Sequence, residues 1–531
     1  MSTILNSTLA FEALSPQEDS PPDHAIIVRF AIYASFALIL WRVWKFTIYP
    51  ALNPSQPAEF PSWIPCHVVP FFRNSNGLFA QARKYLNNIE EPFALTILGI
   101  TFYVVAEPKH SAEVYKATKS LSFEGFVQNL MRTNGGDEHA IGLMYSSLPV
   151  SKYGFPNPQG ESLGALAQKM HIHQLHPGEN LRNLQRRAGA WIDRSVNPST
   201  LRDMCSYAKF HGSGAVEVPL YYWCSNMFVR LGQHVYFGEA LHHINPDLPA
   251  AFFEFDECIW QMLYQYPNFL SGSMIRGRTQ IIASLKKYFS LPKSERADGA
   301  AWLINAMEDE GRAIGIDDGN LAVMVFHLYF AINTNTRRTA FWLLTYLLES
   351  PSLLEKYRAE TEPAFSGQSL VDPGYIQDGS KCPTVEAIWL ETLRLCSWSA
   401  SVRLVARDTV IGGKLLRKGN QVVVPNRLLH FDESAFGEDT EAFRPERWQK
   451  PDLAQSPSWR PFGGGKTMCS GRFLARYVVT CFVATVLRRF DVEKIGDPPF
   501  PRADVGRPTL GIISVKEGDD FNVRLSPRQS P

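Results

Sequence analysis

The pattern of apolar and polar residues predicts several long helices and a smaller number of strands. Residues 26–46 are mostly apolar, and about 20 such residues suffice for a helix that crosses a bilayer. Residues 321–349 form the longest apolar helical stretch in the rest of the chain, and residues 473–490 have the pattern of an amphipathic helix. Residues 93–106 instead have strand character, with a hairpin turn at 97–101.

The surroundings of the first apolar stretch predict a membrane anchor. The residues before it are polar and acidic, and they include a glycosylation sequon at Asn6 that is usable only on the lumenal side. No small-residue cleavage site follows, which favours a retained anchor over a cleaved signal peptide. Acidic residues before the stretch and basic residues after it place the rest of the chain on the cytoplasmic side. Arg29 leaves a second interpretation open, a helix lying in the membrane interface.

These features divide the chain into four parts. We expect a polar lumenal tail at 1–24, a transmembrane anchor at 25–46, a hinge at 47–70 and a globular domain at 71–531. The hinge is dense in proline, which lacks an N–H donor, so we expect neither a helix nor a central strand there. Apolar residues make up 45% of the chain, which is ample for a sizeable core.

Charge and cysteine spacing exclude two classes of function. The 53 Lys and Arg residues nearly balance 52 Asp and Glu, and the net charge of +1 offers no footprint for nucleic acid. The eight cysteines lie far apart, with no Cys-x-x-Cys and no His pairing at zinc spacing. They suit reduced thiols in a domain that faces the cytosol.

The stretch 461–471 is the strongest sign of chemistry in the sequence. It places four glycines around Cys469, and glycine allows backbone to approach a bulky group closely. A helix follows at once, so its unpaired N–H groups would favour a thiolate at this cysteine. The alternative interpretation is a buried structural cysteine.

Other polar clusters interrupt regular stretches. Residues 331–337 place Asn and Thr inside the long apolar helix, which indicates a cavity, bound water or a kinked core helix with local partners. Residues 168–191 are basic and rich in histidine, but the histidine spacing does not converge on one helix face, so a solvated surface or an anion clamp is favoured over zinc. Glu391 and Arg394 form a pair on one helix face.

The pattern Phe-x-x-Gly-x-x-x-Cys-x-Gly at 462–471 resembles the haem-ligand loop of the cytochrome P450 family. Glu-Thr-Leu-Arg at 391–394 and Phe-Arg-Pro-Glu-Arg-Trp at 443–448 precede it in the family's order, and the resemblance covers roughly residues 60–525. It implies a mainly α-helical fold with a smaller β-rich lobe and one N-terminal membrane helix. One departure is Thr467, where the family usually has Arg or His for a haem propionate.

The resemblance implies haem b with Cys469 as the axial ligand of the iron. It places Thr336 and Asn335 where the family has an alcohol and an acid that handle oxygen and protons; because an asparagine does not titrate, Thr336 and an ordered water would carry the relay. It also implies haem contacts and a buried structural network. The contact residues are Phe462, Gly463, Gly465, Gly471, Arg403 and a cation or histidine such as Lys169 or His173; the network residues are Glu391, Arg394 and Arg447.

Asn335-Thr336, Phe341-Trp342 and Thr467 look most like the branch that contains cholesterol 7α-hydroxylase and prostacyclin synthase. The implied activity is a monooxygenase of the endoplasmic reticulum membrane that acts on a lipophilic substrate such as a sterol, a terpenoid or another lipid. Electrons would come from NADPH through a separate NADPH–cytochrome P450 reductase, with cytochrome b5 as a second candidate donor. The alternatives are a haem-thiolate isomerase or dehydratase that needs no reductase, and a haem or sterol binding protein without catalysis.

Overall fold

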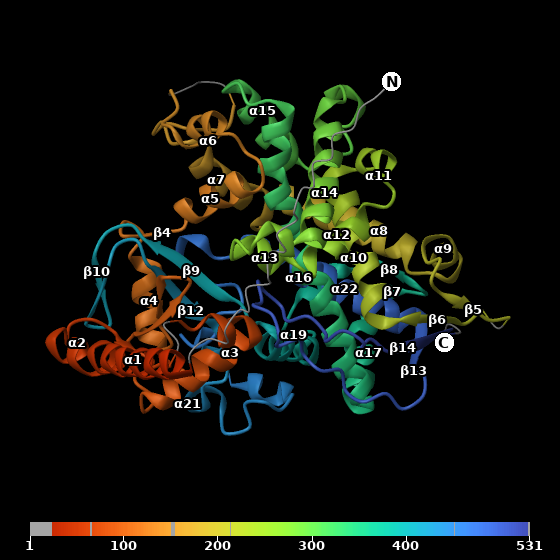
Figure 1. The fold of residues 1–531 in the computed structure, drawn as a ribbon. Coiled ribbons are helices and arrows are strands. Elements are labelled where there is room, and N and C mark those ends of the chain that lie inside the picture. Colours follow the sequence, from red (N-terminus) through yellow and green to blue (C-terminus); the bar gives the residue numbers. More distant parts are fainter. Residues whose placement is uncertain (1–23, 64–65, 150–153, 213, 451, 529–531) are drawn as a thin grey trace, which may run out of the picture. The chain divides into compact units, whose positions relative to one another are not determined.

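The computed structural model describes residues 24–63, 66–149, 154–212, 214–450 and 452–528 (Figure 1). The chain separates into two compact units. Among the described residues, one contains 24–54 and 61–63, and the other contains 55–60 and those from Cys66 onward. The expected tail, including the sequon at Asn6, lies outside the described residues except for its last position.

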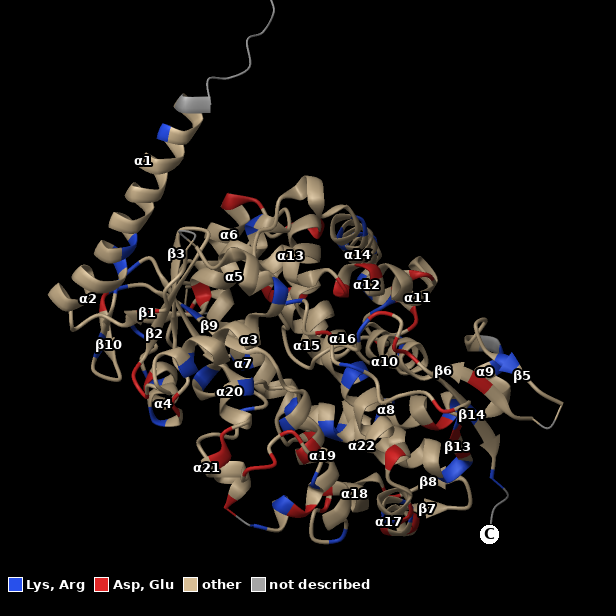
Figure 2. Ribbon diagram, turned by 60° about the horizontal axis from the view of Figure 1, so that its bottom comes forward, with Lys and Arg blue, Asp and Glu red and all other residues tan. Residues whose placement is uncertain are grey.

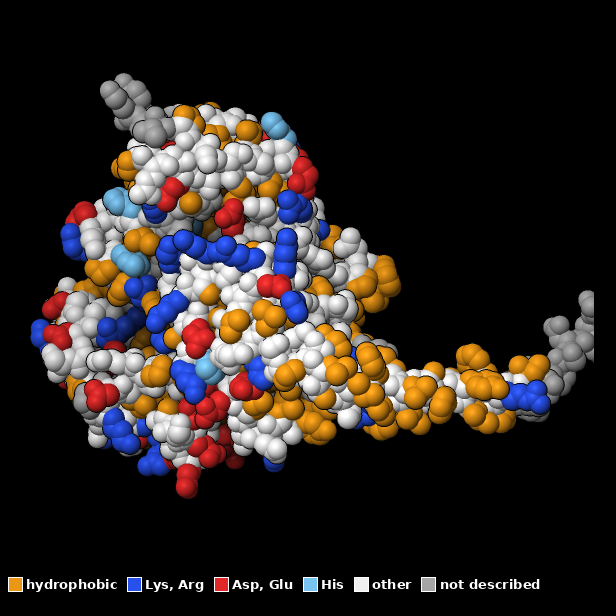
Figure 3. All heavy atoms as spheres, turned by 90° about the vertical axis from the view of Figure 1, so that its left-hand side faces the viewer, with side chains coloured by type: hydrophobic (Ala, Val, Ile, Leu, Met, Phe, Trp, Pro, Cys, Tyr) orange, Lys and Arg blue, Asp and Glu red, His pale blue; other side chains and the backbone are white. Residues whose placement is uncertain are grey.

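The first unit is a helix that continues beyond the expected anchor. It runs as α1 (His24–Val43), a π-helical stretch (Trp44–Ile48) and α2 (Tyr49–Leu52). Among its 27 residues from Ile26 to Leu52, an 18-residue window has a mean hydropathy of 1.8, and hydrophobic side chains surround the helix (Figure 3). Basic residues and no acidic ones lie along it (Figure 2).

The prediction that the hinge contains neither a helix nor a central strand is therefore wrong for the helix. Helix persists to Leu52 because Pro50 falls in the first turn of α2, where its missing N–H needs no partner. A short strand at Ala58–Glu59 follows, and a helix begins at Val68 with Pro70 again in its first turn.

A six-stranded mixed sheet forms the β-rich side of the larger unit. Its strands, in spatial order, are β1 (Ala58–Glu59), β2 (Phe93–Ile97), β3 (Ile100–Val104), β12 (Gln421–Pro425), β9 (Ala400–Val405) and β4 (Leu121–Ser122). Leu98 and Gly99 join β2 to β3 with φ of 50° and 79°, the left-handed conformations of a tight hairpin turn. The predicted hairpin is confirmed.

Smaller sheets lie elsewhere in the same unit. They are β13 (Phe490–Lys494) with β14 (Asn522–Pro527), β6 (Val216–Pro219) and β5 (Lys209–Phe210); β10 (Thr409–Ile411) with β11 (Lys414–Leu416); and β7 (Phe365–Ser366) with β8 (Ser369–Leu370).

Helices make up most of the larger unit. They are α3 (Val68–Tyr85), α4 (Pro108–Lys116), α5 (Glu124–Thr133), α6 (Glu138–Tyr145), α7 (Leu163–Leu175), α8 (Glu179–Ser195), α9 (Pro198–Met204), α10 (Leu220–Phe237), α11 (Ala240–Ile244), α12 (Leu248–Asp256), α13 (Ile259–Leu263), α14 (Gly272–Ser290), α15 (Trp302–Ala313), α16 (Asp318–Glu349), α17 (Pro351–Thr361), α18 (Pro373–Gln377), α19 (Pro383–Cys396), α20 (Asn426–His430), α21 (Glu433–Phe436) and α22 (Arg472–Arg489). The fold is mainly α-helical with a smaller β-rich part, as the resemblance implied.

Helix α16 is the centre of this fold (Figure 1). The Asp317 side chain caps its start by accepting a hydrogen bond from the Asn320 N–H at 2.8 Å, and Pro351 opens the next helix just beyond its end. Helices α10, α14, α19 and α22 pack around it. A helix that is apolar on most sides must be surrounded in this way, so the predicted long helix is confirmed as a core element.

Candidate active site

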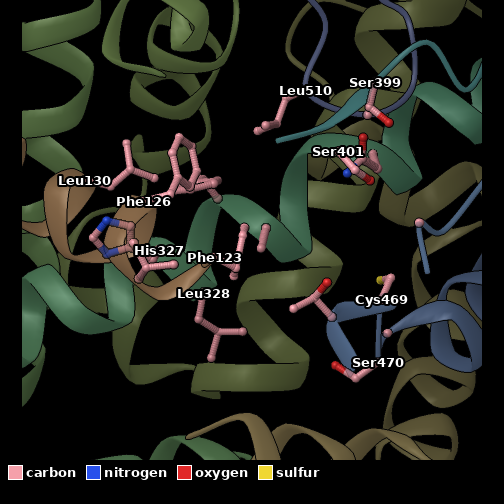
Figure 4. A pocket seen from close by; sticks show the side chains of 18 of the residues that line it. Phe123, Phe126, Leu130, His327, Leu328, Ser399, Ser401, Cys469, Ser470 and Leu510 are labelled. Atoms are coloured by element: carbon pink, nitrogen blue, oxygen red, sulfur yellow. The ribbon is translucent and has the colours of Figure 1, made fainter. Parts of the chain in front are cut away.

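A cavity of about 1360 Å³ opens beside α16 in the larger unit (Figure 4). Its walls come from α5, α7, α10, α16, strand β9, the glycine-rich stretch 461–471 and the segment 508–512. Most lining side chains are apolar, including Phe126, Leu130 and Leu328. Small-molecule pockets usually measure about 300–1,000 Å³, so this cavity has room for a large cofactor together with a substrate.

Cys469 is exposed to this cavity at one of its ends (Figure 4). All eight cysteines lie among the described residues, and Cys469 alone lines the cavity. Its N–H donates to the carbonyl oxygen of Phe462 at 3.0 Å, which closes the glycine-rich stretch into a loop. Phe462, Gly463 and Gly471 line the cavity with it.

The thiol of Cys469 is held neutral when no metal is bound. Burial raises its pKa, while the N–H groups of Gly471 and Arg472 and the Arg472 guanidinium act in the opposite direction. The expected preference for a thiolate at a helix start is therefore outweighed by burial. A bound metal cation would reverse the balance, because a coordinating thiol is deprotonated outright.

Two glycines of the loop serve packing rather than the cavity. A Cβ on Gly464 would lie 2.8 Å from the Tyr115 ring, and one on Gly465 would lie 2.9 Å from the Tyr115 carbonyl oxygen. Gly465 also has a φ of +63°, which favours glycine. The structure thus turns Gly465 toward α4 and does not bring it to the cavity wall.

Thr336 and Asn335 lie on the α16 wall of the cavity. The hydroxyls of Thr334, Thr339 and Thr345 each bond the carbonyl oxygen one turn earlier. The Thr336 hydroxyl makes no such bond within the described structure, so it is available to a group in the cavity. The Asn335 side chain is already engaged, since its Oδ1 accepts a hydrogen bond from the Ile512 N–H at 2.9 Å.

Strand β9 contributes a polar row to the cavity wall. Arg403 and Ser401 lie on the strand and Ser399 just before it, so alternate positions bring all three side chains to one face. The Arg403 guanidinium donates to the Thr467 hydroxyl and to the Val402 carbonyl oxygen, and burial lowers its pKa. It is 7% exposed, and no carboxylate pairs with it among the described residues. A buried cation of this kind calls for an anionic partner.

Helix α7 presents a different polar side chain from the one expected. Its cavity face carries Gln168 and His171, one turn apart, whereas Lys169 points elsewhere and pairs with Glu161. His171 Nδ1 lies 2.6 Å from the Ala167 carbonyl oxygen, and burial lowers the pKa of the ring. His173 packs against Trp302 with ring centroids 4.6 Å apart and does not line the cavity.

Glu391, Arg394 and Arg447 come together outside the cavity, as a buried cluster. The Glu391 carboxylate accepts from Arg394 Nε and Nη2 at 2.9 and 2.8 Å, and from Arg447 Nε at 2.9 Å. It also accepts from the Arg444 backbone N–H and from Trp448 Nε1, which the sequence did not single out. Glu391 and Arg394 are fully buried, and the carboxylate is satisfied by hydrogen bonds from four protein residues.

The residues around the cavity fit a haem. Its size exceeds the need of a substrate alone, a single thiol opens into it, and the buried guanidinium of Arg403 has no anionic partner in the part of the chain that the structure describes. A haem would fill the extra volume, its iron would bind the thiol, and its carboxylate side chains would pair with the guanidinium. Fold and site together define a protein that holds a prosthetic group over a cysteine, in a cavity shared with an apolar ligand.

Comparison with known proteins identifies the family. The cytochrome P450 family model matches residues 252–514. A cytochrome P450 monooxygenase, poxD of Penicillium oxalicum, is 24% identical over 83% of this chain and 88% of its own length. A bifunctional cytochrome P450/NADPH–P450 reductase of Bacillus cereus is 28% identical over 52% of this chain and 24% of its own length. The structure of a retinoic acid-bound cyanobacterial CYP120A1 superposes with a TM-score of 0.63 at 20% identity, covering 87% of this chain and 96% of that one.

The chain belongs to the cytochrome P450 family. It is therefore a haem protein with a cysteine thiolate as iron ligand, and an oxidoreductase of the monooxygenase class.

Several site residues were missed by the sequence reasoning. Ser399 and Ser401 alternate with Arg403 and could have been found from strand periodicity. His171 shares a helix face with Gln168, but the pattern alone does not say which face meets a cavity. The role of the segment 508–512 depends on long-range contacts and left no signal in the sequence.

Proposed function

We propose that this chain is a membrane-anchored monooxygenase that inserts one oxygen atom from O2 into a lipophilic substrate, with Cys469 as the axial ligand of haem. The observation that carries the proposal is the single thiol exposed to a large, mostly apolar cavity, whose α16 wall offers a Thr336 hydroxyl with no hydrogen-bond partner among the described residues. The apolar walls favour a sterol, a terpenoid or another lipid over a polar metabolite.

The residues that would hold the haem come from three elements. Cys469 would hold the iron. The Arg403 guanidinium, beside the Thr467 hydroxyl, would pair with one haem propionate. His171 on α7 would contact the second propionate. The bound haem would supply oxygen activation at iron, which thiolate donation favours. A neutral Thr467 in the loop makes Arg403 the principal cation for this role.

Thr336 would handle protons in the cavity. A hydroxyl can accept one hydrogen bond while it donates another, so it can pass a proton from a water to a neighbouring oxygen without changing its own charge. The amide of Asn335 does not titrate and its Oδ1 is already engaged, which leaves the Thr336 hydroxyl and an ordered water as the relay.

The membrane anchor and the electron donor are further parts of the proposal. The apolar helix from Ile26 to Leu52 is long enough to cross a bilayer, and its exposed hydrophobic side chains favour a single-pass anchor in the endoplasmic reticulum membrane. A relative that joins a P450 to an NADPH–P450 reductase supports that type of reductase as the donor. The proposal keeps cytochrome b5 as a second candidate donor, which this relative does not bear on.

A second apolar stretch does not compete with this anchor. Gly465–Arg489 also meets the length and hydropathy needed for a span, but 67% of its apolar 18-residue window is buried in the fold, and most of the stretch is α22. It is a core helix of the catalytic domain, which the proposal places at 71–531 on the cytoplasmic side.

Turnover with isotopically labelled O2 tests the activity. We expect a panel of sterols, terpenoids and fatty acids to yield a product that carries one labelled oxygen, only when NADPH and reductase are both present. Omitting the reductase is the control. Conversion of a peroxide without label and without reductase would instead establish an isomerase, and turnover absent under any electron supply would leave a binding protein.

In the same assay Thr336→Val should lower the rate of product formation by about 10²-fold, the scale of a lost proton-transfer group. Thr339→Val is the matched control, because its hydroxyl already bonds the Asn335 carbonyl oxygen.

Haem retention tests the assignment of the propionate contacts. Transfer of haem to excess apomyoglobin should be about tenfold faster or more in Arg403→Ala, because a charged hydrogen-bond partner of a buried carboxylate is lost. His171→Ala should show a smaller acceleration, and Lys169→Ala should resemble the wild type because Lys169 pairs with Glu161. Faster loss from the Lys169 variant than from the His171 variant would contradict the assignment.

A further inference from the structure

Side chains from successive turns of helix α16 form hydrogen bonds with the backbone of the segment 508–513. Asn335 Oδ1 accepts from the Ile512 N–H at 2.9 Å, and Arg338 Nη1 donates to the Ile512 carbonyl oxygen at 3.2 Å. Trp342 Nε1 donates to the Ile513 carbonyl oxygen at 2.8 Å. Positions 335, 338 and 342 share one face of the helix, so they act on the segment together. We call residues 508–513 the wall segment.

The wall segment is also bonded to the end of α19 and to the turn that joins α19 to β9. The Gly511 carbonyl oxygen accepts from the N–H groups of Trp398 and Ser399 at 3.0 and 3.1 Å, and the Ile513 N–H donates to the Cys396 carbonyl oxygen at 2.8 Å. These bonds leave the segment little freedom. Its residues 508–512 form part of the cavity wall, and the Leu510 side chain lies there (Figure 4).

Gly511 shows how closely the Asn335 amide is fitted to the wall segment. A Cβ at position 511 would lie 1.9 Å from Asn335 Oδ1 and 2.6 Å from its Cγ. Any side chain there would have to displace the amide from its bond with Ile512. The glycine is needed for space at this point, and the tight fit makes Asn335 and Gly511 mutually dependent.

We propose that Asn335 is a positioning residue: by accepting the Ile512 N–H it sets where the wall segment, and Leu510 with it, faces the substrate, and it takes no part in proton transfer. The proposal rests on the proposed function, since it assumes that a substrate occupies this cavity. It differs from what the family resemblance implied for position 335. The atom that matters is the acceptor oxygen, because Oδ1 makes the printed contact and the amide nitrogen makes none among the described residues.

Thr336 follows Asn335 directly on α16, so the contact between Asn335 and the wall segment also affects the surroundings of the Thr336 hydroxyl. Because Asn335 and Thr336 are adjacent, the wall segment is fixed relative to the Thr336 hydroxyl. A change at Asn335 should therefore alter where a ligand lies in the cavity without removing the relay itself.

Two substitutions separate an acceptor role from a donor or relay role. Asn335→Asp keeps an oxygen at the Oδ1 position, whereas Asn335→Leu keeps the size and removes it. In hydrogen–deuterium exchange of the haem-loaded protein, the Ile512 amide should exchange about fivefold faster or more in the Leu variant, while the Asp variant should stay within about twofold of the wild type.

Azole binding supplies a readout that a general loss of stability would not move. Imidazole reports access to the iron, and 4-phenylimidazole reports the walls around it as well. The ratio of their dissociation constants should change by about threefold or more in Asn335→Leu and remain near the wild-type ratio in Asn335→Asp. An unchanged ratio in the Leu variant, or an Asp variant that behaves like the Leu variant, would overturn the proposal.

A double-mutant cycle provides an independent check. Gly511→Ala should speed exchange at Ile512 in the wild type because its methyl group displaces the amide. In an Asn335→Ala background the methyl group has room, so adding Gly511→Ala should cause little further change. Effects that multiply in the double variant would overturn the proposal.

The failure of the proposed function has a different signature. If no haem were held by a thiolate, the carbon monoxide difference spectrum would lack the thiolate band in every variant. Exchange at Ile512 would still report the contact with Asn335, so the two outcomes are distinguishable.

Discussion

Cys469→Ala is expected to lose the thiolate band in the carbon monoxide difference spectrum completely, and monooxygenase turnover with it. Of the eight cysteines, Cys469 alone lines the cavity, so no other thiol can replace it without a rearrangement of the fold. The loop itself should persist, because its closing bond uses the Cys469 backbone N–H and the Phe462 carbonyl oxygen. Far-ultraviolet circular dichroism should therefore stay near that of the wild type.

Cys258→Ser is the matched control for this experiment. Cys258 is half-buried between α12 and α13, away from the cavity lining, and its replacement should leave the spectrum unchanged. A thiolate band that survived in Cys469→Ala would show that another residue holds the iron. It would remove the observation on which the proposed function rests.

Glu391→Gln is expected to destabilise the protein by about 3–5 kcal/mol, the cost of breaking a buried ion pair by removing one charge. The glutamine has nearly the same shape, but it leaves the guanidinium groups of Arg394 and Arg447 without a counter-charge and turns an amide toward donors. Denaturant unfolding followed by circular dichroism measures the loss, and haem content per protein should fall in parallel.

An exposed glutamate offers the control for Glu391. Glu441 contacts Arg427 at 3.3 Å with its own side chain 81% exposed, and Glu441→Gln should change stability by less than about 1 kcal/mol. If Glu391→Gln were equally mild, the buried cluster would not contribute to stability as its geometry indicates.

Local patterns in the sequence were sufficient to predict several elements of the fold. The apolar run of α16 is long enough to predict a helix without knowledge of the helices that pack against it. The turn at Leu98 and Gly99 follows from strand alternation on both sides. The glycine-rich stretch around Cys469 was equally readable, because a helix start and a cysteine are adjacent along the chain. Such features depend on residues a few positions apart, which is the range over which sequence patterns are informative.

The proline content of residues 47–70 predicts a hinge without helix, and this prediction is wrong. Pro50 and Pro70 each fall in the first turn of a helix, where proline is tolerated, and only the helix boundaries reveal this. At α7, too, the sequence does not show which residue faces the cavity. Lys169 and His171 are both polar and close in sequence, but Lys169 pairs with Glu161 and His171 lines the cavity. Helical periodicity relates these residues to one another and does not say which face is covered.

By itself the sequence determined the order of the main elements, the cysteine loop, the long central helix and the Glu-Arg motif, because each is encoded by residues that are near neighbours in the chain. Only the tertiary structure decided that Asn335 bonds Ile512, that Gly465 packs on Tyr115, and that Arg403 lies at the cavity wall with no carboxylate from the described residues beside it. These contacts join residues far apart in the sequence. Their geometry is set by how helices and sheet pack together, and no single segment contains that information.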